Sequence, residues 1–170
     1  MSNELTTTSN SDVVANSSDQ AGSEAATNDY VTMTIADQLF GIPVLSVHDV
    51  LGPQKITRVP LSPPEVAGVL NLRGRIVTAI NIRRRLGLPD ADSQGGMSVA
   101  VEHNGESYSL LIDKIGEVLS VSPGAFEQSP ATLDPCWREV SSGVYRLEGG
   151  LLVILDVEKL LNIGDEVIAA

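Results

Sequence analysis

Short alternating runs of apolar and polar residues, broken by Gly and Pro, fill the chain from Tyr30 onward. The apolar positions are mostly Val, Ile and Leu, and a two-residue repeat rich in β-branched side chains is typical of half-buried strands rather than helices. The pattern therefore predicts a mainly β body with few short helices.

The strand pattern occurs twice. The apolar positions of residues 31–51 coincide with those of residues 99–119 when the sequence is shifted by 68 residues. A shift of 75 residues aligns 68–86 with 143–161 in the same way. The second shift pairs Gly68 with Gly143. The difference between the shifts implies seven extra residues in the central loop of the second half. The sequence is thus interpreted as two copies of one β unit, at about 31–88 and 98–163.

Each copy ends in a short predicted helix. Asn81 and Asp156 stand where such a helix needs an N-cap, and Gly87 and Asn162 stand where it needs a left-handed residue to end. Two small β units with exposed edges would be costly as open sheets. We therefore expect closure into two small barrels packed on each other, with a seam between them.

The two ends of the chain differ from this body. Residues 1–29 are rich in Ser, Thr, Asn and Ala and predict a disordered acidic tail, followed by a body at 30–165 and a short tail at 166–170. The formal net charge of −11 argues against nucleic acid or an anionic membrane as partner. A single cysteine, no leader pattern and no run long enough to span a bilayer favour a cytoplasmic protein that does not insert into a membrane.

The chain offers few candidates for catalytic or metal-binding residues. His48 and His103 lack ligand spacing, and His103 lies in "EHNGE", which predicts a hairpin turn. Cys136 is expected to be a buried, inert thiol in a short helix capped by Asp134. The run 83–85, three arginines, is interpreted as the solvated basic end of a helix. No catalytic residue, cofactor or metal is predicted.

One charge interrupts the apolar stretch "GVLNLRGRIVTAINI", residues 68–82. Arg73 stands close to Asn71 and Gly74, two residue types that suit a tight turn. We expect this arginine at a hairpin tip or strand corner, reaching toward Asp49 on the exposed face of a neighbouring strand. A solvated arginine with no fixed partner is the alternative.

The combination of "FGIPVLSVHDVLGPQKITRVP", "PPEVAGVLNLRGRIVTAINIRRRLG", "SLLIDKIGEVLSV" and "LLVILDVEKLL" resembles the CheW family of chemotaxis coupling proteins, from Tyr30 to Ile163. The resemblance implies two five-stranded SH3-like barrels. It also implies a non-enzymatic adaptor that joins the hairpin tip of membrane chemoreceptors to the regulatory domain of a cytoplasmic histidine kinase.

The resemblance also supplies candidate site residues. The family's partner contacts fall on Val47, Asp49, Gly68, Arg73 and Gly143, with an arginine-to-acid contact between Arg73 and Asp49. Val47 has a second interpretation as a core residue, because the repeat pairs it with an apolar position. The acid is an aspartate where better-known members carry glutamate, and the acidic tail lies outside the family pattern.

Two alternatives stay open at this point. An adaptor of the same kind can serve a chemosensory-like pathway that controls surface motility or gene regulation. A small-ligand β-barrel or an enzyme would instead require a polar pocket with converging titratable groups.

Overall fold

The computed structural model describes residues 27–91 and 96–163. The predictions for residues 1–26 and 166–170 lie outside these ranges. The first strand begins at Asn28, so the last two residues of the predicted tail belong to the folded body. Asp29 there accepts a hydrogen bond from the Ser120 hydroxyl at 2.6 Å.

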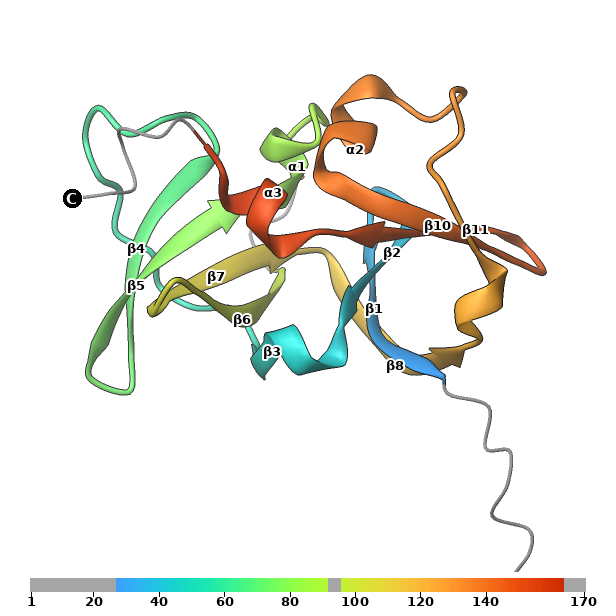
Figure 1. Ribbon diagram of the computed structural model, residues 1–170. Coiled ribbons are helices and arrows are strands. Elements are labelled where there is room, and N and C mark those ends of the chain that lie inside the picture. Colours follow the sequence, from blue (N-terminus) through green and yellow to red (C-terminus); the bar gives the residue numbers. More distant parts are fainter. Residues whose placement is uncertain (1–26, 92–95, 164–170) are drawn as a thin grey trace, which may run out of the picture.

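The described chain is mainly β, as predicted. The strands are β1 (Asn28–Ile35), β2 (Gln38–Pro43), β3 (Val47–Leu51), β4 (Val66–Leu72), β5 (Arg75–Asn81), β6 (Met97–His103), β7 (Glu106–Ile112), β8 (Lys114–Val121), β9 (Phe126–Glu127), β10 (Ser141–Leu147) and β11 (Gly150–Leu155). The α-helices are α1 (Ile82–Arg85), α2 (Pro135–Val140) and α3 (Val157–Leu161), and single 3-10 turns occur at η2 (Val44–Ser46) and η3 (Pro123–Ala125). Figure 1 shows the three α-helices gathered near the junction of the two sheets.

The strands form a six-stranded sheet, in the order β8-β1-β2-β11-β10-β9, and a five-stranded sheet, in the order β3-β6-β7-β5-β4. Neither sheet is made by one repeat copy alone. The hairpin β1–β2 of the first copy joins the six-stranded sheet through a parallel pairing with β11, and β6–β7 of the second copy joins the five-stranded sheet through a parallel pairing with β5. The expectation that each copy forms its own barrel is therefore wrong, because the copies exchange their first hairpins.

The repeat itself is visible in this exchange. Replacing each strand by its counterpart in the other copy converts one sheet order into the other, and the counterpart of β9 is an isolated antiparallel bridge between Thr57 and Val69. The sheets are thus related by an approximate twofold exchange. Closure of each sheet into an SH3-like barrel is not established by these pairings and stays a prediction.

Three apolar clusters hold the body together. The largest joins the two sheets and includes Met33 and Phe40 from one and Val99 and Leu110 from the other. A second cluster lies on the six-stranded sheet around Tyr145, and a third lies on the five-stranded sheet. The members of the third cluster are Leu70, Val77 and Ala79, with partly buried neighbours. Adjacent residues of a strand serve different clusters because their side chains point to opposite faces.

The helix ends follow the predicted chemistry with one exception. The Asn81 and Asp156 side chains accept hydrogen bonds from amides of α1 and α3, and Gly87 has a φ of 74°. Asn162 has a φ of −80°, so the predicted left-handed conformation is wrong. The chain turns there through a hydrogen bond from the Ile163 amide to the Leu161 carbonyl, which needs no positive φ.

Cys136 is exposed, which corrects the expectation of a buried thiol. Asp134 caps α2 as predicted, accepting a hydrogen bond from the Cys136 amide at 2.9 Å. The face of α2 that points inward carries Trp137 and Val140, three residues apart, so Cys136 lies on the other side. Trp137 packs against Phe40 with ring centroids 5.3 Å apart.

The three arginines of α1 are engaged rather than solvated, which corrects the sequence interpretation. Arg83 makes two hydrogen bonds to Asp113, at 2.9 and 2.6 Å, and its side chain is 20% exposed. Arg84 binds Asp90 in the same two-pronged way, and Arg85 donates to the Leu160 and Lys159 carbonyls at the end of α3. The cations of the short helix thus bind the β7–β8 junction, the segment that follows the helix, and α3.

Candidate partner-binding site

Arg73 and Gly74 form the two-residue turn between β4 and β5, with φ values of 54° and 86°. Two positive φ values in a row define the tight hairpin turn in which Asn-Gly is favoured and other side chains are strained. Asn71 lies in β4 and supports the turn through its side chain, whose Oδ1 accepts a hydrogen bond from the Gly74 amide at 2.9 Å. The hairpin tip is confirmed, with the strained position held by the arginine itself.

Asp49 reaches the face opposite Val47 because of a β-bulge. In a regular strand, residues two apart share a face, so an unbroken β3 would place Val47 and Asp49 on the same face. The pairing of β3 with β6 shifts between them: Val47 lies opposite Val101 and Asp49 opposite Ala100. Val101 and Ala100 are consecutive in β6, so their side chains point to opposite faces of the sheet. The bulge therefore turns Asp49 away from the apolar cluster between the sheets.

The predicted ion pair is present. The guanidinium of Arg73 lies 2.7 Å from Oδ2 of Asp49, with the arginine side chain 78% exposed and the aspartate side chain 29% exposed. The other carboxylate oxygen, Oδ1, accepts a hydrogen bond from the Val50 amide at 2.9 Å. Both oxygens are therefore engaged, and the carboxylate has one orientation despite its short side chain.

Val47 is half-buried and packs against the cluster between the sheets. This contact supports its interpretation as a core residue, which the repeat alignment had indicated. A direct role in partner contact stays a prediction.

Gly68 and Gly143 are buried and occupy matching places in the two sheets. A Cβ on Gly68, whose φ is 147°, would overlap the Thr57 backbone, and a Cβ on Gly143 would lie 2.6 Å from the Glu127 carbonyl oxygen. Each glycine thus lets a neighbouring segment pair closely with its strand. Gly143 belongs to the other sheet from Val47, Asp49, Gly68 and Arg73, and the predicted set does not form one surface patch around it.

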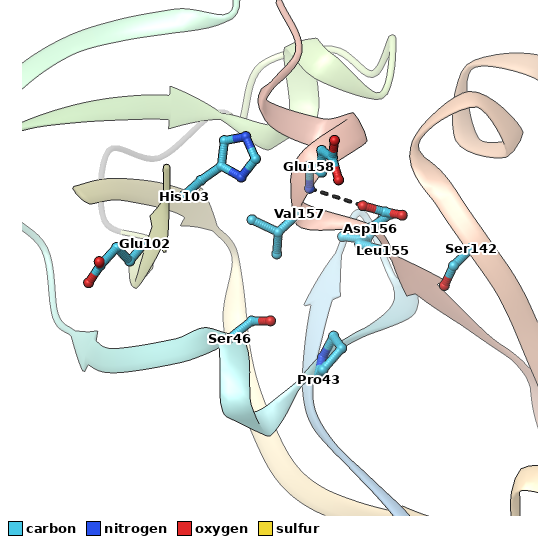
Figure 2. Close-up of a pocket in the computed structure, with 9 residues that line it drawn as sticks. All are labelled: Pro43, Ser46, Glu102, His103, Ser142, Leu155, Asp156, Val157 and Glu158. Atoms are coloured by element: carbon cyan, nitrogen blue, oxygen red, sulfur yellow. Dashed lines mark hydrogen bonds between the residues drawn. The ribbon is translucent and has the colours of Figure 1, made fainter. Parts of the chain in front are cut away.

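A pocket of about 320 Å³ opens where the two sheets meet, and sequence reasoning did not find it. Its lining residues come from five segments: Pro43, Ser46, Glu102, His103, Ser142, Leu155, Asp156, Val157 and Glu158. Figure 2 shows Val157 pointing into the pocket and the carboxylate of Glu102 pointing away from its centre. No sequence signal links these positions, because the exchanged hairpins bring them together.

Three of the four titratable side chains that line this pocket, Glu102, His103 and Asp156, already have partners. Asp156 Oδ1 accepts hydrogen bonds from the amides of Glu158 and Lys159, at 3.0 and 3.3 Å. Glu102 lies 3.7 Å from Nε2 of His48 on the neighbouring strand. The pocket therefore gives no support to the alternative of a small-ligand barrel, which requires polar groups that converge on a ligand.

Within residues 27–91 and 96–163, no helix is long and apolar enough to cross a bilayer. The same ranges contain no group of three or more His, Cys, Asp or Glu residues placed to hold a metal ion.

The described body thus combines two sheets, an internal twofold repeat and an ion-paired hairpin tip. The family model for the CheW-like domain matches residues 29–164. The chain therefore belongs to the CheW family.

Characterised relatives agree with this assignment. The chain is 28% identical over 137 residues to a chemotaxis protein CheW of Treponema pallidum, covering 78% of this chain and 81% of that protein. It is 29% identical over 147 residues to the chemotaxis protein CheW of Helicobacter pylori, covering 84% and 88%. The crystal structure of the scaffolding protein TtCheW from Thermoanaerobacter tengcongensis shares the fold, with a TM-score of 0.75 and 24% identity over 85% of this chain and 99% of that one.

Proposed function

We propose that this protein is a non-enzymatic adaptor of chemotaxis signalling, which couples transmembrane chemoreceptors to a histidine kinase. The observation that carries the proposal is the family match over nearly the whole described body, together with relatives named as chemotaxis proteins over most of their lengths. In this role the protein transmits a signal through contacts and performs no chemistry.

The receptor's helical hairpin tip binds along the seam between the two sheets. Partly buried apolar side chains at the edge of the cluster that joins the sheets support this assignment, because apolar contacts dominate the centre of such an interface. Val47 lies at the edge of that cluster and contributes from there.

The kinase regulatory domain binds at the end of the five-stranded sheet that carries the β4–β5 hairpin. Support comes from the Arg73–Asp49 pair, because a strained backbone held at an exposed tip is a feature that folding alone does not explain. At an interface such a pair sets geometry and partner choice. The protein acts in the cytoplasm, recruited to receptor arrays at the membrane without inserting into it.

Size-exclusion chromatography of the chain with the chemotaxis kinase of its own organism tests the proposal. We expect co-elution with the full kinase and with its isolated regulatory domain, and loss of co-elution with a kinase that lacks this domain. Separate elution of well-folded partners at concentrations of about 10 μM, where a Kd of about 1 μM gives mostly complex, would contradict it.

A further inference from the structure

Four basic residues lie on the β4–β5 hairpin and on the segment bridged to β4, along the edge of the five-stranded sheet. Arg73 and Arg75 belong to the β4–β5 hairpin, where Arg75 pairs with Leu72. The bridge between Thr57 and Val69, with backbone hydrogen bonds of 2.8 Å in both directions, brings the segment with Lys55 and Arg58 alongside β4. We call Lys55, Arg58, Arg73 and Arg75 the basic end; Figure 1 shows this hairpin at the far side of the sheet from the junction.

Three of these four cations have no partner of their own. Arg73 is paired with Asp49, whereas the side chains of Lys55, Arg58 and Arg75 make no ion pair or hydrogen bond within the described part of the chain. All four residues are exposed. Ile76, 70% exposed, lies next to Arg75 in the strand and adds an aliphatic side chain to the same end.

The internal repeat shows that the fold does not require these charges. The matching hairpin turn between β10 and β11 has Glu148 and Gly150 where the basic end has Arg73 and Arg75. The matching third strand runs through η3 and β9, where Ala125 and Gln128 stand at the positions of Lys55 and Arg58. The same backbone is therefore built with no basic residue at any of the four positions.

These charges also oppose the balance of the whole chain. The protein carries 22 acidic and 11 basic residues, yet four of the basic ones lie on the β4–β5 hairpin and the segment bridged to it, where only Arg73 among the four has an acidic partner, Asp49. Clustered like charges repel and contribute nothing to folding. Local features that lower stability, and that no structural contact compensates, are concentrated at functional surfaces.

We propose that the basic end binds an acidic surface of the kinase regulatory domain, with Lys55, Arg58 and Arg75 steering the encounter. This inference rests on the proposed function and adds the chemistry of the partner surface. Because the four matching positions of the other sheet carry one acid and no base, and the nearby Arg146 is paired with Glu127, a partner with an acidic surface is attracted to the basic end over the other. The charges thus select which of two equivalent ends receives the kinase.

A protein surface is favoured over a membrane or nucleic acid. Both of those are extended anionic surfaces that would also meet the acidic remainder of the molecule, and a net charge of −11 repels them. A protein partner can present carboxylates locally and leave the rest of the contact neutral.

The test is a charge reversal with a matched control. The first variant carries Lys55→Glu, Arg58→Glu and Arg75→Glu. The control carries Lys114→Glu, Arg138→Glu and Lys159→Glu, which changes the net charge equally at three exposed cations elsewhere on the described surface. Circular dichroism confirms folding of both. Association with the isolated kinase regulatory domain is then followed by stopped flow at about 0.05 M and about 0.5 M salt, where screening is weak and strong.

We expect the association rate constant of the basic-end variant to fall at least tenfold below that of the parent at low salt, with the difference shrinking at high salt. The control variant should stay within about threefold of the parent, because its charges lie away from the contact. Equal losses in the two variants, or none in either, would overturn the inference while leaving the adaptor function intact.

Two other outcomes are also decisive. If the parent does not bind the regulatory domain at all, the proposed function fails and this inference fails with it. If the parent instead binds vesicles rich in phosphatidylserine or a DNA duplex, and only that binding is lost in the basic-end variant, the partner is a phosphate surface and the inference is wrong.

Discussion

Replacing Arg73 by Asn separates the folding role of the β4–β5 turn from its binding role. The turn has φ values of 54° and 86°, and the β6–β7 turn of the same chain reaches 51° and 80° with Asn104 and Gly105. Arg73→Asn therefore converts one turn into the sequence that the protein already uses at another, and Asn-Gly is the favoured pair for this geometry.

Two opposing terms set the expected stability. A non-glycine residue in the left-handed region costs about 1 to 2 kcal/mol, and Asn relieves part of that cost. The ion pair with Asp49 contributes about 0 to 1 kcal/mol, at the low end here because the arginine side chain is 78% exposed. The free energy of unfolding in urea should therefore stay within about 1 kcal/mol of the parent.

Binding should respond differently. Loss of the guanidinium leaves the Asp49 carboxylate without its cation at the interface, which costs about 2 to 5 kcal/mol in binding free energy and weakens kinase association at least tenfold. Asp49→Asn keeps the shape of the side chain and an oxygen for the Val50 amide, so it removes only the charge. Calorimetric titration of both single variants and the double variant measures the coupling energy between the two residues.

Two results would refute this reasoning. A loss of more than about 2 kcal/mol in the unfolding free energy of Arg73→Asn would mean that the arginine holds the fold together. Additive effects of the two substitutions on binding would mean that the residues act independently and that the ion pair has no role at the interface.

Three further predictions concern stability. Gly143→Ala should lower the unfolding free energy by about 1 to 3 kcal/mol, because the new Cβ overlaps the backbone of β9. Gly124→Ala is the control and should change little, because its Cβ meets only one side-chain atom, at 3.9 Å. Equal urea midpoints for the two variants would refute this prediction. Val47→Asp should destabilise by several kcal/mol because the charge enters the edge of the cluster between the sheets, and an unchanged thermal midpoint would instead mark Val47 as a surface residue. The hydrogen bonds from Arg83 hold the pKa of Asp113 below its ordinary 3.8, so the stability that this pair provides is complete above about pH 4 and is lost as pH falls through the lower folded pKa. Asp113→Asn should therefore reduce the dependence of the unfolding free energy on pH in this acid range. An unchanged acid transition would exclude the pair as its cause.

Local chemistry predicted much of the fold. The caps at Asn81 and Asp156, the left-handed Gly87 and the turn at 104–105 each depend on a residue and its immediate neighbours. The internal repeat also predicted the correspondence of strands, because apolar side chains must recur at the same places when two units share one backbone.

Long-range arrangement was not accessible in the same way. Hairpins β1–β2 and β6–β7 have the same apolar pattern whether they pair within their own copy or with the other, so the pattern cannot choose between the two sheets. The pocket at the junction escaped prediction for this reason.

The candidate site shows the same division. The pairing of Arg73 with Asp49 was predicted from a charge in an apolar stretch and from the family resemblance, and the contact is present. The bulge that turns Asp49 away from the core could not be located from the sequence, because it depends on how β3 pairs with β6. The burial of Gly68 and Gly143 likewise depends on which segment lies against them.

Co-sedimentation with receptor-bearing vesicles tests the central claim most directly. Vesicles that display the cytoplasmic hairpin of a chemoreceptor are mixed with the histidine kinase, with and without this protein, and the pelleted kinase is measured. The account predicts that the kinase sediments only when the adaptor is present and that Arg73→Asn reduces the pelleted amount at limiting concentrations. Kinase that pellets equally with and without the protein, or that never pellets although each component is folded, would contradict the claim that the protein couples receptor to kinase.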